Sequence, residues 1–163
     1  IALVGDIGSG KTFIASMFNC PIFNADNEVA KIYKTDIKCF KKLKKKLPKF
    51  FYNFPIGKDN LIRAILHNNQ NLKKITQVVH PIIKKRLKVF LKQNKKKKFV
   101  ILDIPLYLEN KLDKKDDIII YIQSKKSEIN KRLKERKNYN KSLINKFKKL
   151  QYSLSFKKKK HIL

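Results

Sequence analysis

Apolar residues along this chain form four short runs, and stretches with helical spacing separate them. A short, almost wholly apolar run is typical of a strand that is buried on both faces of a parallel sheet. The expected strands are Ile1–Val4, Pro21–Phe23, Phe99–Ile104 and Ile118–Ile122. Strands that alternate with helices predict an α/β fold in which right-handed crossovers place helices on both faces of the sheet. Ligands of such folds bind at the carboxyl ends of the strands.

Helical spacing of apolar residues predicts the elements between the strands. Val29, Ala30 and Ile32 recur in this way and predict a helix from about residue 27 to residue 33. The other expected helices are Lys11–Phe18, Ser127–Arg136 and Ser142–Phe156. Residues 36–94 are mostly helical in pattern, with breaks at Pro48 and at residues 55–57 that divide them into at least three pieces. We therefore expect a core of about residues 1–29 and 95–163, with a helical insertion of about residues 30–94.

A glycine-rich segment directly after the first strand carries the strongest chemical signal. The residues Gly5-Asp6-Ile7-Gly8-Ser9-Gly10-Lys11-Thr12 match the phosphate-loop pattern G-x-x-x-x-G-K-[ST] at every defined position. Glycines let backbone N–H groups approach phosphate oxygens, and the helix that follows directs its positive end at the same anion. In this motif the lysine reaches the β- and γ-phosphates, and the hydroxyl of the last residue ligates Mg²⁺. The residues expected to bind ATP are Gly5, Ile7, Gly8, Ser9, Gly10, Lys11, Thr12 and Phe13, and the alternative is a glycine-rich turn that arose by chance.

This motif predicts nucleotide binding but does not specify a reaction. The Asn-Lys-x-Asp motif of guanine-nucleotide proteins is absent, and the chain is too short for most motor ATPase cores. Asp26 follows the second strand, where a base for an incoming hydroxyl group belongs, although the same residue could cap the next helix. Asp103, at the end of an apolar strand, could hold Mg²⁺ through water or simply end the strand. Asp6 is expected to point to solvent or to a basic side chain.

Six segments, in order along nearly the whole chain, resemble the dephospho-coenzyme A kinase family. They are the phosphate loop, residues 24–30, residues 61–66, His80-Pro81-Ile82, Pro105-Leu106-Tyr107-Leu108-Glu109, and Arg132 and Arg136 with Gln151 downstream. The family pattern is D-A-D-x-x-A in the second segment and L-D-R-x-x-L in the third. This chain keeps the second Asp of D-A-D, the proposed base, as Asp26. It departs from the family at Thr12, Asn24 and Ile62, where the family has Ser, Asp and Asp.

The resemblance implies a P-loop kinase with a three-layer sandwich, a helical acceptor-binding subdomain and a helical lid of about residues 126–140. The implied reaction transfers the γ-phosphoryl group of ATP, with Mg²⁺, to the ribose 3′-hydroxyl of dephospho-CoA, which is the last step of coenzyme A synthesis. The implied catalytic residues are Asp26 as the base, Lys11 on the phosphates, and Arg132 and Arg136 as the lid arginines. Because these arginines are four residues apart, they should share a helix face, and the alternative is an exposed basic face.

The resemblance also implies which residues contact the acceptor. The expected set is Asp26, Arg63, His80, Pro105, Leu106 and Glu109. Arg63 could instead form a surface salt bridge, and Glu109 could cap the turn after the proline. His80 is expected to be structural or to contact the acceptor, because no second ligand sits at a metal-binding spacing.

The net charge of +29 adds a second class of function to consider. A nucleic-acid-binding P-loop ATPase is one alternative, and a kinase of another small hydroxyl or nucleotide acceptor is the nearer one. The basic residues are almost all Lys, spread over the chain without a stripe, an arm or an RNA-binding signature, so a nucleic-acid partner is not expected. The lysine runs at residues 95–98 and 157–160 are expected to be solvated turns or helix faces. Such a charge would still draw nucleotides toward a cleft.

Location and chain ends complete the expectations. No apolar run approaches the ~18 residues of a membrane-spanning helix, and no signal peptide is visible. Cys20 and Cys39 lack a metal or disulfide spacing, which fits reduced thiols in a cytoplasmic protein.

The chain begins at Ile1 without Met and ends at His161-Ile162-Leu163, before the family's A-D-x-V-I-x-N-x-G stretch, and His161 departs from the family's Asp. We therefore expect residues to be missing at both ends, including the last strand and the final helix.

Overall fold

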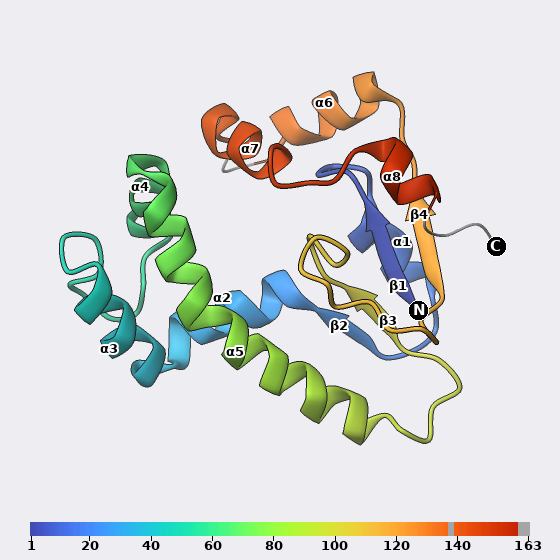
Figure 1. Cartoon of the computed structure of the whole chain (residues 1–163), viewed down its shortest axis with the longest axis horizontal. Coiled ribbons are helices and arrows are strands. Elements are labelled where there is room, and N and C mark those ends of the chain that lie inside the picture. Colours follow the sequence, from blue (N-terminus) through green and yellow to red (C-terminus); the bar gives the residue numbers. More distant parts are fainter. Residues whose placement is uncertain (137–138, 160–163) are drawn as a thin grey trace. The chain divides into compact units, whose positions relative to one another are not determined.

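The computed structural model of this protein describes residues 1–136 and 139–159, so the expectation for His161 and part of the expected lid lie outside the described residues. Within them, four strands form one parallel sheet in the order β2-β3-β1-β4 (Figure 1). The strands are β1 (Ala2–Gly5), β2 (Ile22–Asn24), β3 (Ile101–Asp103) and β4 (Ile119–Ile122). The predicted parallel α/β sheet is thus confirmed, although each strand begins or ends within one or two residues of the predicted boundary.

The chain divides into two compact units, and the first of them contains the sheet. This unit comprises Ile1–Ala25 and Asn94–Leu163, and the second comprises Asp26–Gln93. In the first unit, α1 (Lys11–Met17) packs against β1 and β3. Leu3, Ala15 and Ile101 are almost wholly buried in the core between this helix and the sheet. The apolar residues of α1 that face the sheet therefore anchor the glycine-rich loop that precedes the helix.

The second unit consists of four helices, α2 (Ala25–Thr35), α3 (Ile37–Lys46), α4 (Lys58–His67) and α5 (Asn69–Gln93). Helices α3 and α4 both pack against α5. Asp36 caps α3, because its carboxylate accepts a hydrogen bond of 2.8 Å from the backbone N–H of Cys39. The predicted breaks at Pro48 and residues 55–57 lie in the same loop between α3 and α4, the break at Asn68 between α4 and α5 was not predicted, and Pro81 lies inside α5. None of the helices among the described residues is long and apolar enough to cross a membrane.

The helix predicted over Ser127–Arg136 ends earlier than expected. The observed helix α6 covers Lys126–Lys134, so Arg136 lies beyond its end. Ile129 and Leu133 are the buried residues of α6, and only charged residues follow them as far as Arg136. A further turn would add no apolar side chain to the contact of Ile129 and Leu133 with the phosphate loop, and packing supplies most of the stability of a short helix. The prediction that Arg132 and Arg136 share one helix face is therefore wrong.

The single helix predicted over Ser142–Phe156 is also wrong, because the structure has two short helices in this region. These are α7 (Lys141–Lys148), capped by Asn140, and α8 (Leu154–Lys159). Between them the backbone N–H of Tyr152 donates a hydrogen bond of 2.8 Å to Glu109 instead of to a helical carbonyl. Tertiary contacts thus interrupt a sequence whose local spacing is helical throughout.

Candidate active site

The glycine-rich loop after β1 requires glycine at specific positions. Gly5, Gly8 and Gly10 all have positive φ angles, of 153°, 87° and 94°. Other residues rarely adopt such angles. A Cβ atom on Gly5 would also lie 2.4 Å from the carbonyl oxygen of Ile122 on β4, which is too close for any side chain. The sequence pattern therefore reflects both the backbone conformation and the close approach of the neighbouring strand.

Lys11 lies over this loop. Its Nζ atom donates hydrogen bonds to the carbonyl oxygens of Gly5, at 3.1 Å, and Asp6, at 2.8 Å. Burial and then the charge of Asp6 raise the pKa of the Tyr121 phenol. The ammonium group of Lys11 is thus held at the carboxyl end of β1, where a phosphate-binding cation is needed.

Asp103 connects three elements at the same edge of the sheet. It ends β3, is 3% exposed, and accepts two hydrogen bonds of 2.7 Å on Oδ2. One comes from Oγ1 of Thr12 on α1, and the other comes from Nδ2 of Asn24 on β2. Asn24 and Asp103 are also partners in the β2–β3 register. Asp103 therefore does more than end a strand, since it orders a threonine and an asparagine from neighbouring elements.

These oxygen atoms fit a magnesium ion by their chemistry. Mg²⁺ prefers carboxylate and hydroxyl oxygens and usually takes only one or two protein ligands beside phosphates and water. Thr12 and Asp103 provide such a pair, with their oxygens joined by a hydrogen bond. Among the described residues no group of three His, Cys, Asp or Glu side chains forms a metal cage. A magnesium ion at this site would therefore take its remaining ligands from water and the phosphates of the nucleotide.

Arg132 is the predicted lid residue that lies beside the phosphate loop. Its Nη1 atom is 3.5 Å from the position of a Cβ atom on Gly10, and it donates to Oγ of Ser124 at 3.3 Å. The Ser124 hydroxyl in turn donates to the carbonyl oxygen of Ser9 at 2.8 Å. Arg132 also lies 3.9 Å from the carboxylate of Glu128. Arg136 is exposed in the bend after α6 and is not brought to the loop by any described contact.

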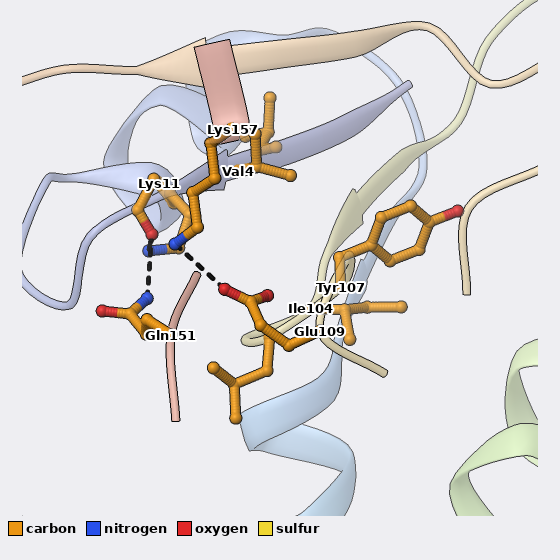
Figure 2. Close-up of a pocket in the computed structure, with 10 residues that line it drawn as sticks. Val4, Lys11, Ile104, Tyr107, Glu109, Gln151 and Lys157 are labelled. Atoms are coloured by element: carbon orange, nitrogen blue, oxygen red, sulfur yellow. Dashed lines mark hydrogen bonds and ion pairs between the residues drawn. The ribbon is translucent and has the colours of Figure 1, made fainter. Parts of the chain in front are cut away.

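The loop after β3 and the end of the chain meet at a small pocket next to the phosphate loop (Figure 2). Leu106, one of the predicted acceptor residues, lines it and has a positive φ of 57°, whereas Pro105 is exposed. Glu109 also lines the pocket and pairs with Nζ of Lys157 at 3.1 Å. Lys157 is only 1% exposed, so the expectation that the whole run 157–160 is solvated is wrong at this residue.

Sequence reasoning missed Lys157 for an identifiable reason. A lysine within a lysine run has no signature of burial, and only a nearby carboxylate makes its burial possible. Ser124 was missed as well, because a lone serine after a strand carries no pattern. Asn24 was noticed only as a departure from a family pattern, and its bond to Asp103 depends on the pairing of β2 with β3.

The remaining predicted residues belong to the helical unit Asp26–Gln93. Asp26 is exposed in the first turn of α2. Arg63 donates to Asn60 Oδ1 at 2.5 Å and to the Tyr52 hydroxyl at 3.5 Å, which are neutral partners. His80 lies in the middle of α5, where partial burial and then the charge of Lys84 lower its pKa.

The parallel strand order and the phosphate loop on β1 define the class of this protein, which is that of the P-loop kinases. The crystal structure of TT1252 from Thermus thermophilus shares the fold, with a TM-score of 0.76 over 98% of this chain and 83% of that one at 21% sequence identity. The family model described as dephospho-CoA kinase matches residues 1–161. This chain therefore belongs to the dephospho-CoA kinase family, as the sequence predicted.

Curated relatives agree with the family model. The dephospho-CoA kinase of Wolbachia pipientis wMel is 32% identical over 164 residues, which cover 98% of this chain and 84% of the relative. That of Wolbachia sp. subsp. Brugia malayi is 33% identical, and the match covers 83% of this chain and 72% of the relative. The predicted enzyme class, an ATP-dependent kinase, is confirmed by these matches.

Proposed function

We propose that this chain transfers the γ-phosphoryl group of ATP to the ribose 3′-hydroxyl of dephospho-CoA, which yields coenzyme A and ADP. The observation that supports this most is the convergence of Lys11, Thr12 and Asp103 at the carboxyl ends of β1 and β3. Phosphoryl transfer depends on charge stabilisation and alignment more than on covalent catalysis, and a lysine, a hydroxyl and a carboxylate meet that need.

The phosphate loop is the proposed ATP site. The backbone N–H groups of the loop would bind the phosphate oxygens, and Lys11 would leave its carbonyl partners for the β- and γ-phosphates. When bound, Mg²⁺ neutralises phosphate charge, and Thr12 and Asp103 are the residues proposed to hold it, Asp103 through water. Arg132, beside Gly10, would stabilise the negative charge of the phosphoryl group in flight.

Asp26 is the proposed general base. The 3′-oxygen attacks the γ-phosphorus, the bond from this phosphorus to the β–γ bridging oxygen breaks, and Asp26 takes the hydroxyl proton. Asp26 follows Asn24 by two residues, and Asn24 donates a hydrogen bond to Asp103. The helical unit of Asp26–Gln93 would bind the acceptor, with Arg63 on an acceptor phosphate and His80 nearby. Pro105, Leu106 and Glu109, in the loop after β3, are further residues proposed to contact the acceptor.

The proposed reaction takes place in the cytoplasm. The support is that Cys20 and Cys39 are free thiols, as is usual in a reducing compartment.

The direct test is ADP release by the purified chain with Mg-ATP, with and without dephospho-CoA. AMP, adenosine and shikimate serve as control acceptors. We expect dephospho-CoA alone to stimulate ADP release, with coenzyme A as the product. Stimulation by one of the other acceptors would instead identify a kinase of that acceptor, and stimulation by DNA or RNA alone would contradict the kinase reaction.

A further inference from the structure

Gln151 contacts the phosphate loop at two backbone positions. Its Oε1 atom accepts a hydrogen bond of 3.3 Å from the N–H of Ile7, and its Nε2 atom donates one of 3.2 Å to the carbonyl oxygen of Gly5. The second of these bonds is drawn in Figure 2. A side-chain amide has a donor and an acceptor on one rigid plane, so it can hold two backbone groups at a set separation. Gln151 therefore restrains the part of the loop between β1 and Gly8.

The position of Gln151 is itself determined by a buried ion pair. Lys157 Nζ lies 3.1 Å from Glu109 Oε1, and the two side chains are only 2% and 8% exposed. The same oxygen of Glu109 accepts from the N–H of Tyr152, the residue next to Gln151, at 2.8 Å. A buried charge is strongly destabilising without its partner. The pair thus resists any movement of the segment 151–157 away from the loop after β3.

Both ends of this segment therefore have a fixed partner. Gln151 contacts the loop that follows β1, and Lys157 contacts a residue of the loop that follows β3. A continuous helix would use the N–H of Tyr152 for a helical carbonyl, whereas here Glu109 accepts a hydrogen bond from this group. The interruption between α7 and α8 thus leaves the N–H of Tyr152 available to Glu109.

We propose that Glu109, Gln151 and Lys157 form a brace that sets the conformation of the phosphate loop for ATP. Gln151 is the positioning residue for Gly5 and Ile7, and the Glu109–Lys157 pair keeps Gln151 in place. The inference rests on the proposed function only in that the loop binds ATP. A loop held in its binding conformation has less conformational entropy to lose when the nucleotide binds, so the brace increases affinity.

The test is the affinity of the full chain for ATP without any acceptor, measured by isothermal titration calorimetry. Gln151→Met keeps the length of the side chain but removes both hydrogen bonds. We expect the Kd for ATP to rise about tenfold, which corresponds to about 1.4 kcal/mol, whereas the Kd for dephospho-CoA and the melting temperature should change little. Gln93→Met, an exposed glutamine at the end of α5, is the matched control and should bind ATP normally.

A second variant tests the ion pair. Single replacement of Glu109 or Lys157 leaves a buried charge unpaired and could prevent folding, so we would use Glu109→Gln with Lys157→Met, which removes both charges at similar volume. We expect a folded protein with a Kd for ATP raised about threefold or more. Unchanged affinity in either variant, with ATP bound by the wild-type chain, would overturn the brace and leave the proposed function intact. Failure of the wild-type chain to bind ATP would overturn both.

Discussion

At the scale of single residues, the contacts of Asp103 at the sheet edge show how neighbouring side chains stabilise a buried carboxylate. Asp103 is buried, yet its Oδ2 atom accepts from both Thr12 and Asn24, so the carboxylate is solvated by protein donors instead of water. An aspartate at position 24 would place a second carboxylate 2.7 Å from this oxygen. Asparagine there supplies a donor and avoids like-charge repulsion. This departure from the family pattern is therefore compatible with an ordered site.

Asp26 is the residue whose role is most directly tested by mutation. Asp26→Asn keeps the size of the side chain but removes the proposed base, so we expect kcat to fall about 10²–10⁴-fold, the range for a lost general base. The Kd for ATP and the melting temperature should be unchanged, because Asp26 is exposed. Steady-state kinetics with dephospho-CoA measures the effect.

Lys11→Ala is the informative comparison for that variant. It should abolish turnover and also weaken ATP binding, since Lys11 is proposed to contact the phosphates directly. Normal turnover by Asp26→Asn would remove Asp26 from the mechanism, and a normal kcat for Lys11→Ala would contradict the proposed ATP site.

At the scale of elements, the phosphate loop and α6 are packed together. A Cβ atom on Gly8 would lie 3.0 Å from Cγ of Leu133 and 3.2 Å from Cγ2 of Ile129, both buried residues of α6. The loop thus depends on glycine for packing against this helix as well as for its φ angle of 87°. Any displacement of α6 would also move Arg132, which lies beside Gly10.

Gly8→Ala tests this dependence. Strain at positive φ and the contact with Leu133 should destabilise the fold by about 1–3 kcal/mol, measured by urea unfolding. Gly57→Ala is the control, because Gly57 has a φ of −70° and a Cβ atom there would meet nothing closer than 3.8 Å. It should change stability by less than about 1 kcal/mol. Equal losses in the two variants would argue against a conformational requirement at Gly8.

Helices α2 and α5 are joined by an ion pair that predicts a pH dependence. Glu28 contacts Lys31 at 2.8 Å and Arg86 on α5 at 2.8 Å. Hydrogen bonds from Lys31 and then Arg86 lower the pKa of Glu28 below its usual value. Because the folded-state pKa is the lower one, this stabilisation is present above the unfolded-state pKa and is lost as the pH falls through the folded-state value.

Glu28→Gln should therefore be less stable than the wild-type chain near pH 6, and the difference should shrink as the pH falls through the folded-state pKa of Glu28. Urea unfolding at a series of pH values measures it. Lys31 is exposed, so Lys31→Met should have a smaller effect than Arg86→Met. A difference between Glu28→Gln and the wild-type chain that is constant with pH would show that the charge of Glu28 contributes nothing.

At the scale of the whole molecule, the outstanding property is the net charge of +29. The charge is carried by lysines throughout both units, and the 41 Lys and Arg residues far outnumber the 12 Asp and Glu residues. A positive field accelerates the approach of anionic nucleotides and coenzyme precursors. It also attracts nucleic acid without specificity.

We expect duplex DNA to bind weakly and to dissociate as salt is raised toward about 0.2 M, because phosphate contacts release counterions. DNA should not stimulate ADP release at any salt concentration. Fluorescence anisotropy of labelled DNA, together with the ADP assay, measures both properties. Tight binding at 0.2 M salt with stimulated ATPase activity would favour a nucleic-acid-dependent ATPase.

The amino-acid sequence by itself was sufficient for the strands, the phosphate loop and the family. Buried parallel strands are short and apolar, and the loop requires glycines at fixed spacing, so both are local patterns that one sequence displays. The break before α4 was likewise readable from Pro55 and Gly57. Local patterns of this kind do not depend on which distant residues come to lie nearby.

Only the tertiary structure decided where α6 ends, why α7 and α8 are separate, and which lysine is buried. Each of these depends on a partner distant in sequence: Gly8 for Ile129 and Leu133 of α6, Glu109 for Tyr152 and Lys157, and Gly5 and Ile7 for Gln151. Helical spacing describes only what a segment can do alone. A hydrogen bond or ion pair to a distant residue can outweigh that preference, because helix propensities differ by less than about 1 kcal/mol per residue, whereas leaving a buried polar group unpaired costs more.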